Sequence, residues 1–142
     1  MKEKDGIRQL FIPKRRALES GFVRRAGLEI SAHLEKITQL MGSGMFMAFH
    51  PSEGEPDITG FLEEQIKKGK ELCFPRFNGT VGGYEMVPVT DFGKDFRIGK
   101  FGIREPQDGI PAVPPEKMKD VPWRVPGVAF DRRGGRLGHG KG

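Results

Sequence analysis

The sequence predicts one domain of the α/β class with a mostly parallel sheet. Three observations lead to this prediction: two short apolar runs, a helical segment between them, and a longer helix before them. A strand, a helix and a second strand within about thirty residues form a βαβ unit, which favours parallel strands with a right-handed crossover. At 142 residues the chain is long enough for a single domain, 1–142, with its own core.

Two helices are expected before the first strand. The N-terminal helical segment, 4–18, contains Pro13, so we expect a break or kink near Phe11 or Ile12. A Gly-Ser-Gly sequence at 42–44 ends the second helix. In that helix six apolar residues recur every three or four positions and should form one buried stripe: Val23, Ala26, Ile30, Leu34, Ile37 and Met41.

The later elements are shorter and less regular. The segment 90–123 is rich in proline, glycine and charge, and we expect little regular structure there. The remaining elements are expected at 45–49 (strand), 57–68 (helix with Asp57 as N-cap), 72–74 (strand closed by Pro75), 84–89 (strand), 116–119 (helical turn) and 128–130 (buried strand).

Composition narrows the class of protein. The single cysteine, Cys73, permits no intramolecular disulfide and favours a reducing compartment. Because Cys73 lies in a predicted strand, we expect a core residue rather than a nucleophile. No apolar run reaches the length of a membrane span, and the charged N-terminus is unlike a secretory signal. We therefore expect a cytoplasmic protein without a membrane partner.

Positive charge is concentrated at the two ends of the chain. Residues 1–25 carry a net charge of +5 and residues 124–142 carry +4, whereas residues 26–123 carry −4. If the fold brings these ends together, they form one positive site for a polyanion; otherwise they are two separate solvated patches. The N-terminal segment lacks interleaved aromatic residues for base stacking, so nucleic acid is the weaker interpretation.

The C-terminal loop is rich in glycine, with five glycines among the last nine residues. Such a loop brings backbone amides close to an anion, and the neighbouring cations increase its positive potential. Residues 135–141 fit the pattern G-x-x-x-x-G-K, but the Ser or Thr of a P-loop is replaced by Gly142. A phosphate-binding loop of another type and a flexible tail are the two remaining interpretations.

Few other residues suggest chemistry. Glu53, Glu55 and Asp57 follow the first strand and are either a carboxylate cluster for a polar ligand or a solvated turn with a helix cap; Glu55 is the strongest candidate. The three histidines are scattered, without the spacing of a zinc site. No Ser-His-Asp pattern is present.

The chain resembles the 5-formyltetrahydrofolate cyclo-ligases, also called methenyltetrahydrofolate synthetases. The sequences PGVAFD at 126–131 and GRLGHGKG at 135–142 are similar to the signature of that family. Three further segments agree in order and spacing: the basic residues Lys4, Arg8, Lys14 and Arg16, the sequence GEPD at 54–57, and the sequence FGIREP at 101–106.

The resemblance implies a fold and a reaction. The fold would be a three-layer α/β/α sandwich. The reaction would be closure of 5-formyltetrahydrofolate to 5,10-methenyltetrahydrofolate with ATP and Mg²⁺, releasing ADP and phosphate. The formyl oxygen would attack the γ-phosphate, and N10 would then close on the activated carbon, so no protein nucleophile is needed. The protein would act as a monomer on a small-molecule substrate, without nucleic acid.

The resemblance also assigns residues. Arg136 and Lys141 would be catalytic, and His50, Glu55 and His139 would bind the folate. The residues expected to bind ATP are Lys4, Arg8, Arg136, Leu137, Gly138, His139, Gly140, Lys141 and Gly142.

Three departures from the family pattern are visible. In one of them, Pro13 interrupts the N-terminal helix, which would shift Lys4 and Arg8 relative to Lys14 and Arg16. The family continues with Tyr-Tyr-Asp, a helix and further strands, so the resemblance implies that the C-terminal strands and helix are missing. The Asp that helps to hold Mg²⁺ would lie beyond Gly142, and no metal ligand is expected within the chain. Pro122-Trp123-Arg124 replaces part of an apolar strand, which predicts weaker pairing there. The alternative is a truncated, non-catalytic relative that binds nucleotide, folate or RNA without turnover.

Overall fold

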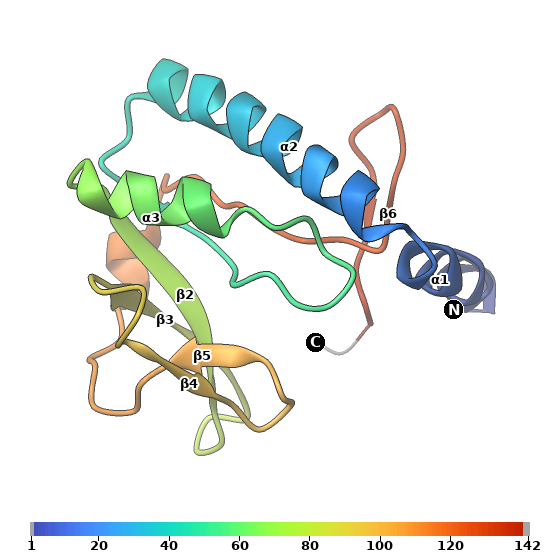
Figure 1. Ribbon diagram of the computed structural model, residues 1–142. Coiled ribbons are helices and arrows are strands. Elements are labelled where there is room, and N and C mark those ends of the chain that lie inside the picture. Colours follow the sequence, from blue (N-terminus) through green and yellow to red (C-terminus); the bar gives the residue numbers. More distant parts are fainter. Residues whose placement is uncertain (1, 141–142) are drawn as a thin grey trace.

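The structure is a computed structural model that describes residues 2–140 (Figure 1). Its elements in chain order are α1 (Lys2–Arg16), α2 (Ser20–Met41), β1 (Met45–Met47), α3 (Thr59–Lys67), β2 (Glu71–Asn78), β3 (Gly83–Val89), β4 (Phe96–Ile98), β5 (Arg104–Pro106), the 3₁₀ helix η1 (Pro115–Met118), β6 (Ala129–Phe130) and β7 (Arg136–Leu137).

The α/β class is confirmed, but the main sheet is mixed rather than mostly parallel. β1 and β2 are parallel, with Met45 opposite Glu71, as the βαβ unit predicts. β2 and β3 are antiparallel, because only residues 79–82 connect them and so short a link makes a hairpin. The predicted end of β2 at Pro75 is wrong. Since β1 pairs only with 71–73, β2 is an edge strand beyond that point and accommodates proline.

A later part of the chain returns to the free side of β1. Trp123 forms a parallel bridge with Met47. The Met47 amide donates to the Pro122 carbonyl at 2.9 Å, and the Arg124 amide donates to the Met47 carbonyl at 2.8 Å. The pairing is no longer than this bridge, as expected from the flanking prolines, Pro122 and Pro126, which have no N–H to donate. The bridge sets where the C-terminal loop begins.

Alternate side chains of the sheet enter two apolar clusters. The first lies beneath α2 and α3, which cover one face of the sheet in Figure 1, and includes Phe46, Ile58, Leu62, Leu72 and Phe74. The second lies on the opposite face and consists of Met47, Cys73, Met86 and Val113, with Met118 of η1 packed against it. Among residues 2–140, a 3₁₀ turn therefore covers the second face, and the three-layer arrangement stays a prediction.

Two helices differ from their expected form. α1 continues through Pro13 to Arg16, so the expected break near Phe11 or Ile12 is wrong, and the alternative of a kink there stays a prediction. A proline removes only one helical hydrogen bond, and the Ala17 amide still donates to the Pro13 carbonyl at 3.0 Å. The α2 stripe was also partly wrong, because Ile30, Ile37 and Met41 are exposed. The buried residues of α2 are instead Gly27 and Thr38, which lie three turns apart.

Gly27 explains why α2 turns a different face to the core from the one that its apolar spacing predicts. A Cβ atom at this position would lie 2.6 Å from the backbone oxygen of Asp57. Glycine therefore lets α2 touch the backbone that precedes α3. Asp57 lies one residue before Ile58, the N-cap of α3, so the prediction of Asp57 as the N-cap is wrong by one residue. Its Oδ1 accepts hydrogen bonds from the Thr59 amide at 3.0 Å and the Thr59 hydroxyl at 2.6 Å. These bonds lower the pKa of the Asp57 carboxyl. The contact fixes the 50–58 loop against α2.

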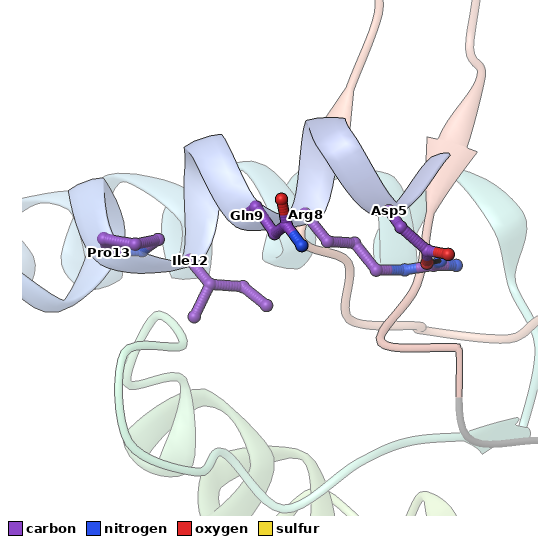
Figure 2. Close-up of a pocket in the computed structure, with 5 residues that line it drawn as sticks. All are labelled: Asp5, Arg8, Gln9, Ile12 and Pro13. Carbon is purple, nitrogen blue, oxygen red and sulfur yellow. Dashed lines mark hydrogen bonds and ion pairs between the residues drawn. The ribbon is translucent and has the colours of Figure 1, made fainter. Parts of the chain in front are cut away.

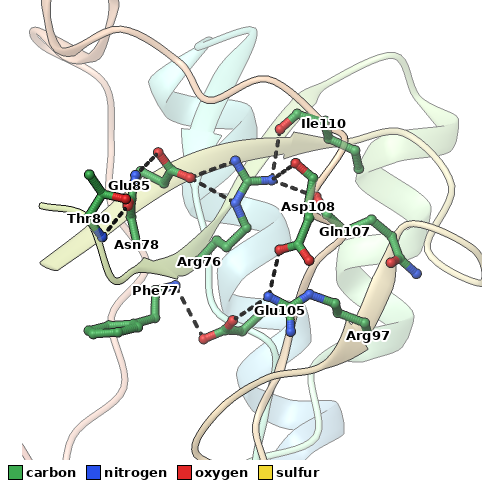
Figure 3. A network of polar contacts seen from close by, with 10 residues as sticks. All are labelled: Arg76, Phe77, Asn78, Thr80, Glu85, Arg97, Glu105, Gln107, Asp108 and Ile110. Atoms are coloured by element: carbon green, nitrogen blue, oxygen red, sulfur yellow. Dashed lines mark hydrogen bonds and ion pairs between the residues drawn. The ribbon is translucent and has the colours of Figure 1, made fainter. Parts of the chain in front are cut away.

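The segment 90–123 is more ordered than expected. β4 and β5 form an antiparallel hairpin that the charge and glycine content concealed. A buried arginine on β2, Arg76, joins this hairpin to the sheet (Figure 3). Its guanidinium donates to Glu85 on β3 at 2.6 and 2.9 Å and to the carbonyls of Gln107 and Ile110 at 2.6 and 2.8 Å. Because a buried charge needs such partners, this network holds β5 and the following loop in place.

His50 lies in an aromatic cluster next to this hairpin. Its ring stacks on Phe92 with centroids 5.3 Å apart and meets the edge of Phe96 at 5.0 Å. Burial lowers the pKa of His50 below its ordinary value of 6.5. His50 is therefore neutral at pH 7, and its role in the fold is apolar packing.

We predict that Gly27→Ala destabilises the protein. The added methyl group must displace α2 or the Asp57 backbone, which typically costs about 1–3 kcal/mol. Gly60→Ala is the matched control: it also adds a methyl group to a helix, but within 4 Å of its Cβ there is open space. This control should gain up to about 1 kcal/mol from helix propensity. Urea denaturation measures both, and equal effects of the two substitutions would contradict the close contact.

We also predict that protonation of His50 destabilises the fold. Because the folded pKa is lower than the unfolded one, the unfolded state binds more protons between those two values, and stability falls as the pH drops below about 6.5. His50→Phe keeps the ring but removes the proton site. The slope of unfolding free energy against pH between 7 and 5 should become shallower in this variant, and an unchanged slope would refute the prediction.

Candidate functional site

The two basic ends of the chain meet at α1. Arg8 Nε donates to the Gly138 carbonyl at 2.8 Å, across 130 positions in the sequence. Its Nη1 is paired with Asp5 at 2.7 Å. Gly140, with φ of +80°, lies so close that a Cβ atom there would be 2.9 Å from the Arg8 guanidinium carbon. The fold therefore places a helix cation and the glycine loop side by side, the first of the two arrangements that the charge distribution allowed.

A second arginine of α1, Arg15, makes a parallel set of contacts. Its Nη1 donates to the Gly127 carbonyl at 3.0 Å, and its Nη2 lies 3.5 Å from His139 Nε2. Lys14 and Arg16, on either side of Arg15, belong to the basic segment predicted from the sequence, whereas Arg15 was not predicted. The available signal was its spacing: Arg8 and Arg15 are seven residues apart and so lie on the same side of a helix.

Glu55 is the carboxylate that reaches this site. Its side chain is buried, 6% exposed, and its Oε1 lies 3.8 Å from His139 Nε2. Its Oε2 accepts a hydrogen bond from the Ser52 amide at 2.9 Å. Of the other two acidic residues of this loop, Glu53 is exposed and Asp57 bonds to Thr59 at the start of α3. The residue expected to bind folate thus lies next to one expected to bind phosphate.

The glycine loop is partly a β-hairpin. β6 pairs with β7, with Ala129 opposite Leu137, so the predicted buried strand at 128–130 is a two-residue strand whose Phe130 is 66% exposed. In the turn, Asp131 Oδ1 accepts hydrogen bonds from the amides of Arg133 and Gly135, both at 2.8 Å. These two amides are already used within the hairpin.

The other predicted residues occupy different positions. Lys4 is exposed on α1, one turn before Arg8. Arg136 of β7 donates through Nη1 to the Pro126 carbonyl at 2.8 Å. Lys141 and Gly142, predicted to be parts of the site, lie outside the described residues. His50 stays within the aromatic cluster described above.

Two hollows adjoin these residues. The first, of about 430 Å³, lies along α1 and is lined by Asp5, Arg8, Gln9, Ile12 and Pro13 (Figure 2). The second, of about 360 Å³, is walled by α2, the Glu55 loop and the segment 123–130. Most of its lining is apolar, including Leu34, Phe49 and Trp123, with the charged side chains of Glu55 and Arg124. An apolar hollow with a few polar groups is typical of a site for a small ring compound.

Arg124, part of the Pro122-Trp123-Arg124 segment that was expected only to weaken a strand, makes contacts of its own. Its guanidinium lies 4.9 Å from the centroid of the Phe46 ring, and its Nη2 donates to Thr38 Oγ1 at 3.0 Å. Burial lowers the pKa of this arginine. It joins the bridge at Trp123 to α2.

The described residues contain neither a candidate metal site nor a membrane-spanning helix. Within residues 2–140 there is no group of three His, Cys, Asp or Glu side chains arranged to hold a metal ion. Over that range, too, no helix combines the length and apolar character needed to span a bilayer.

Comparisons with known proteins agree with one another. The 5-formyltetrahydrofolate cyclo-ligase family matches over residues 1–142. A probable 5-formyltetrahydrofolate cyclo-ligase of Schizosaccharomyces pombe is 35% identical over 81 residues, which are 57% of this chain and 39% of that protein. The NMR structure of Aquifex aeolicus 5,10-methenyltetrahydrofolate synthetase superimposes with a TM-score of 0.81 and 34% identity, covering 98% of this chain and 68% of the other. The chain therefore belongs to the 5-formyltetrahydrofolate cyclo-ligase family.

Proposed function

We propose that this protein converts 5-formyltetrahydrofolate to 5,10-methenyltetrahydrofolate with cleavage of ATP to ADP and phosphate, the formyl oxygen leaving as part of the phosphate. Family membership supports the reaction class. The observation that carries the proposal to this chain is the contact between Glu55 and His139, 3.8 Å apart, because it joins a carboxylate suited to folate with the loop suited to phosphate. The matched residues cover 39% of the S. pombe relative, so the activity of that whole protein is a proposal for this chain.

The ATP site in this proposal lies between α1 and the glycine loop. Its proposed members are Lys4 and Arg8 of α1 and five residues of the loop: Arg136, Leu137, Gly138, His139 and Gly140. Lys141 and Gly142, which the family resemblance adds, lie outside the described residues. Arg8 already donates to Gly138, so its charge lies where a phosphate oxygen would meet the loop. Guanidinium groups bind phosphate through directed hydrogen bonds. Arg136 and Lys141 would stabilise the negative charge that spreads during transfer.

The folate site in this proposal is the apolar hollow beside Glu55. A pterin ring presents amino and N–H donors at one edge, and a buried carboxylate is a strong acceptor for them. The ring faces would contact the apolar lining, which includes Leu34 and Trp123. His50 would act less directly, because its ring packs on Phe92 and Phe96 and supports the wall of the loop that carries Glu55.

The protein would contribute position and charge to the reaction. The formyl oxygen of the substrate is itself the nucleophile toward the γ-phosphate, so a reactive side chain is not required. Cys73 is unsuited to that role, since burial raises the pKa of its thiol to about 12. A Mg²⁺ ion bound with ATP needs only one or two carboxylates besides the phosphates. Among residues 2–140 no group of three candidate ligands is present, and we assign no step to the metal. We further propose a monomer in the cytoplasm.

The test is direct. The full chain, mixed with ATP, Mg²⁺ and 5-formyltetrahydrofolate, should produce the absorbance of the methenyl product, and omission of ATP should abolish it. If the chain binds folate or nucleotide in calorimetry but yields no product, the non-catalytic alternative replaces this proposal.

Substitutions at the two subsites should affect different substrates. We predict that Arg8→Gln raises KM for ATP by about 10- to 100-fold and KM for the folate by a smaller factor, because the variant loses a charged donor to the phosphates as well as the hydrogen bond to the Gly138 carbonyl that holds the loop. Glu55→Gln should do the reverse. The controls are the exposed Lys36→Gln on α2 and Glu63→Gln on α3, which make the same charge changes away from the site. If both site variants raise the same KM, the two subsites are not where we place them.

A further inference from the structure

We propose that Arg124 is a further substrate-binding residue, which holds a carboxylate of the substrate's glutamate tail at the end of the apolar hollow away from Glu55. This inference rests on the proposed function, because it extends the folate site to the rest of the substrate. The guanidinium stands where the family pattern has part of an apolar strand. The assignment therefore concerns this chain, not the family as a whole.

The guanidinium of Arg124 is half-buried without a counter-charge. In the part of the chain that the structure describes, it makes one hydrogen bond, from Nη2 to Thr38 Oγ1 at 3.0 Å, and no ion pair. Its Nε is buried with no partner at all. A charge withdrawn from water costs free energy unless an opposite charge or hydrogen bonds replace the water. A carboxylate that enters the hollow would supply that missing partner.

Glu55 and Arg124 are the two charged side chains that line the hollow, and they lie toward opposite ends of it. Gly27 of α2 touches the backbone of Asp57, two residues after Glu55, whereas the Arg124 guanidinium bonds to Thr38 of the same helix. Thr38 lies eleven residues after Gly27, which is about 16 Å along a helix. The hollow is therefore elongated along α2, with a carboxylate near one end and a guanidinium near the other.

The wall between these two charges is apolar. Ile30 and Leu34 come from α2, and Trp123 and Val125 come from the segment 123–130. The substrate has the complementary order of groups: the donors of the pterin ring, then the apolar p-aminobenzoyl ring, then the carboxylates of the glutamate tail. A pterin that donates to the carboxylate at one end would direct its tail along this wall toward the guanidinium at the other.

The backbone of Arg124 is fixed before any ligand binds. Its amide donates to the Met47 carbonyl at 2.8 Å, and its guanidinium lies 4.9 Å from the centroid of the Phe46 ring. A donor that is already held in place loses little freedom when it binds, so more of the interaction appears as affinity. Guanidinium groups also match carboxylates through paired hydrogen bonds.

The diamide of 5-formyltetrahydrofolate provides the test. Both glutamate carboxylates are carboxamides in this compound, so the tail keeps its size and loses only its charge. In calorimetry on the full chain, with a non-hydrolysable ATP analogue present, the acid should bind about 10- to 100-fold more tightly than the diamide. Arg124→Met should remove this preference by weakening the acid alone, since its side chain still packs on Phe46. Arg124→Lys should retain part of the preference.

Two variants serve as controls. Arg24→Met removes the same charge from an exposed position on α2 and should leave the preference intact. Thr38→Val removes the hydrogen-bond acceptor of Arg124 but keeps its charge, so this variant should still prefer the acid. A role of Arg124 limited to joining its segment to α2 predicts otherwise, because loss of that contact would affect both ligands alike.

The outcomes separate this inference from the proposed function. An unchanged preference in Arg124→Met, or equal weakening of both ligands, would overturn the inference even if the protein forms the methenyl product. Failure of the unaltered protein to bind either ligand would also overturn it. Binding with the expected preferences but without product would overturn the proposed function alone and leave Arg124 as a folate-binding residue.

Discussion

Two arginines on one side of α1 hold the C-terminal loop against the rest of the molecule. Arg8 donates to the Gly138 carbonyl and Arg15 to the Gly127 carbonyl, and both contacts join residues more than a hundred positions apart. A charged donor to a carbonyl is worth more than a neutral one, and two such contacts fix an orientation as well as a position. Without them a hairpin of two short two-residue strands, β6 and β7, would have little to order it. These two hydrogen bonds from α1 therefore hold the loop in the position that forms the candidate site.

A second constraint brings the Glu55 carboxylate to the same place. Gly27 allows α2 to touch the Asp57 backbone, and Asp57 in turn accepts a hydrogen bond from the Thr59 amide at the start of α3. The loop between β1 and α3 is thereby pinned at its far end, and Glu55 is buried facing His139. The contact at Gly27 carries no chemistry of its own. It nevertheless decides whether the carboxylate and the phosphate loop lie within reach of each other.

Several features were predictable because they depend on neighbours in the sequence. The βαβ unit, the glycine that ends α2 at Gly42 with φ of +63° and the burial of Cys73 all follow from local patterns. The stripe on α2 was partly wrong because apolar spacing gives a face but not the neighbour that it meets; the buried residues are Gly27 and Thr38. The burial of Arg76 could not be predicted from the sequence, since its partners, Glu85 and the carbonyls near Gln107, come from separate segments.

The class of fold and the family were evident from the sequence alone. So was the chemical character of the two ends, with glycine and cations at the C-terminus and cations on the first helix. The sequence also singled out one carboxylate, between Gly54 and Pro56. Only the tertiary structure decided that α1 runs unbroken past Pro13, that Arg15 faces His139, and that His50 belongs to an aromatic cluster. The reason is physical. Charge and helical spacing are properties of a segment, whereas the partner of an arginine depends on which distant carbonyl or ring the folded chain brings within hydrogen-bonding distance.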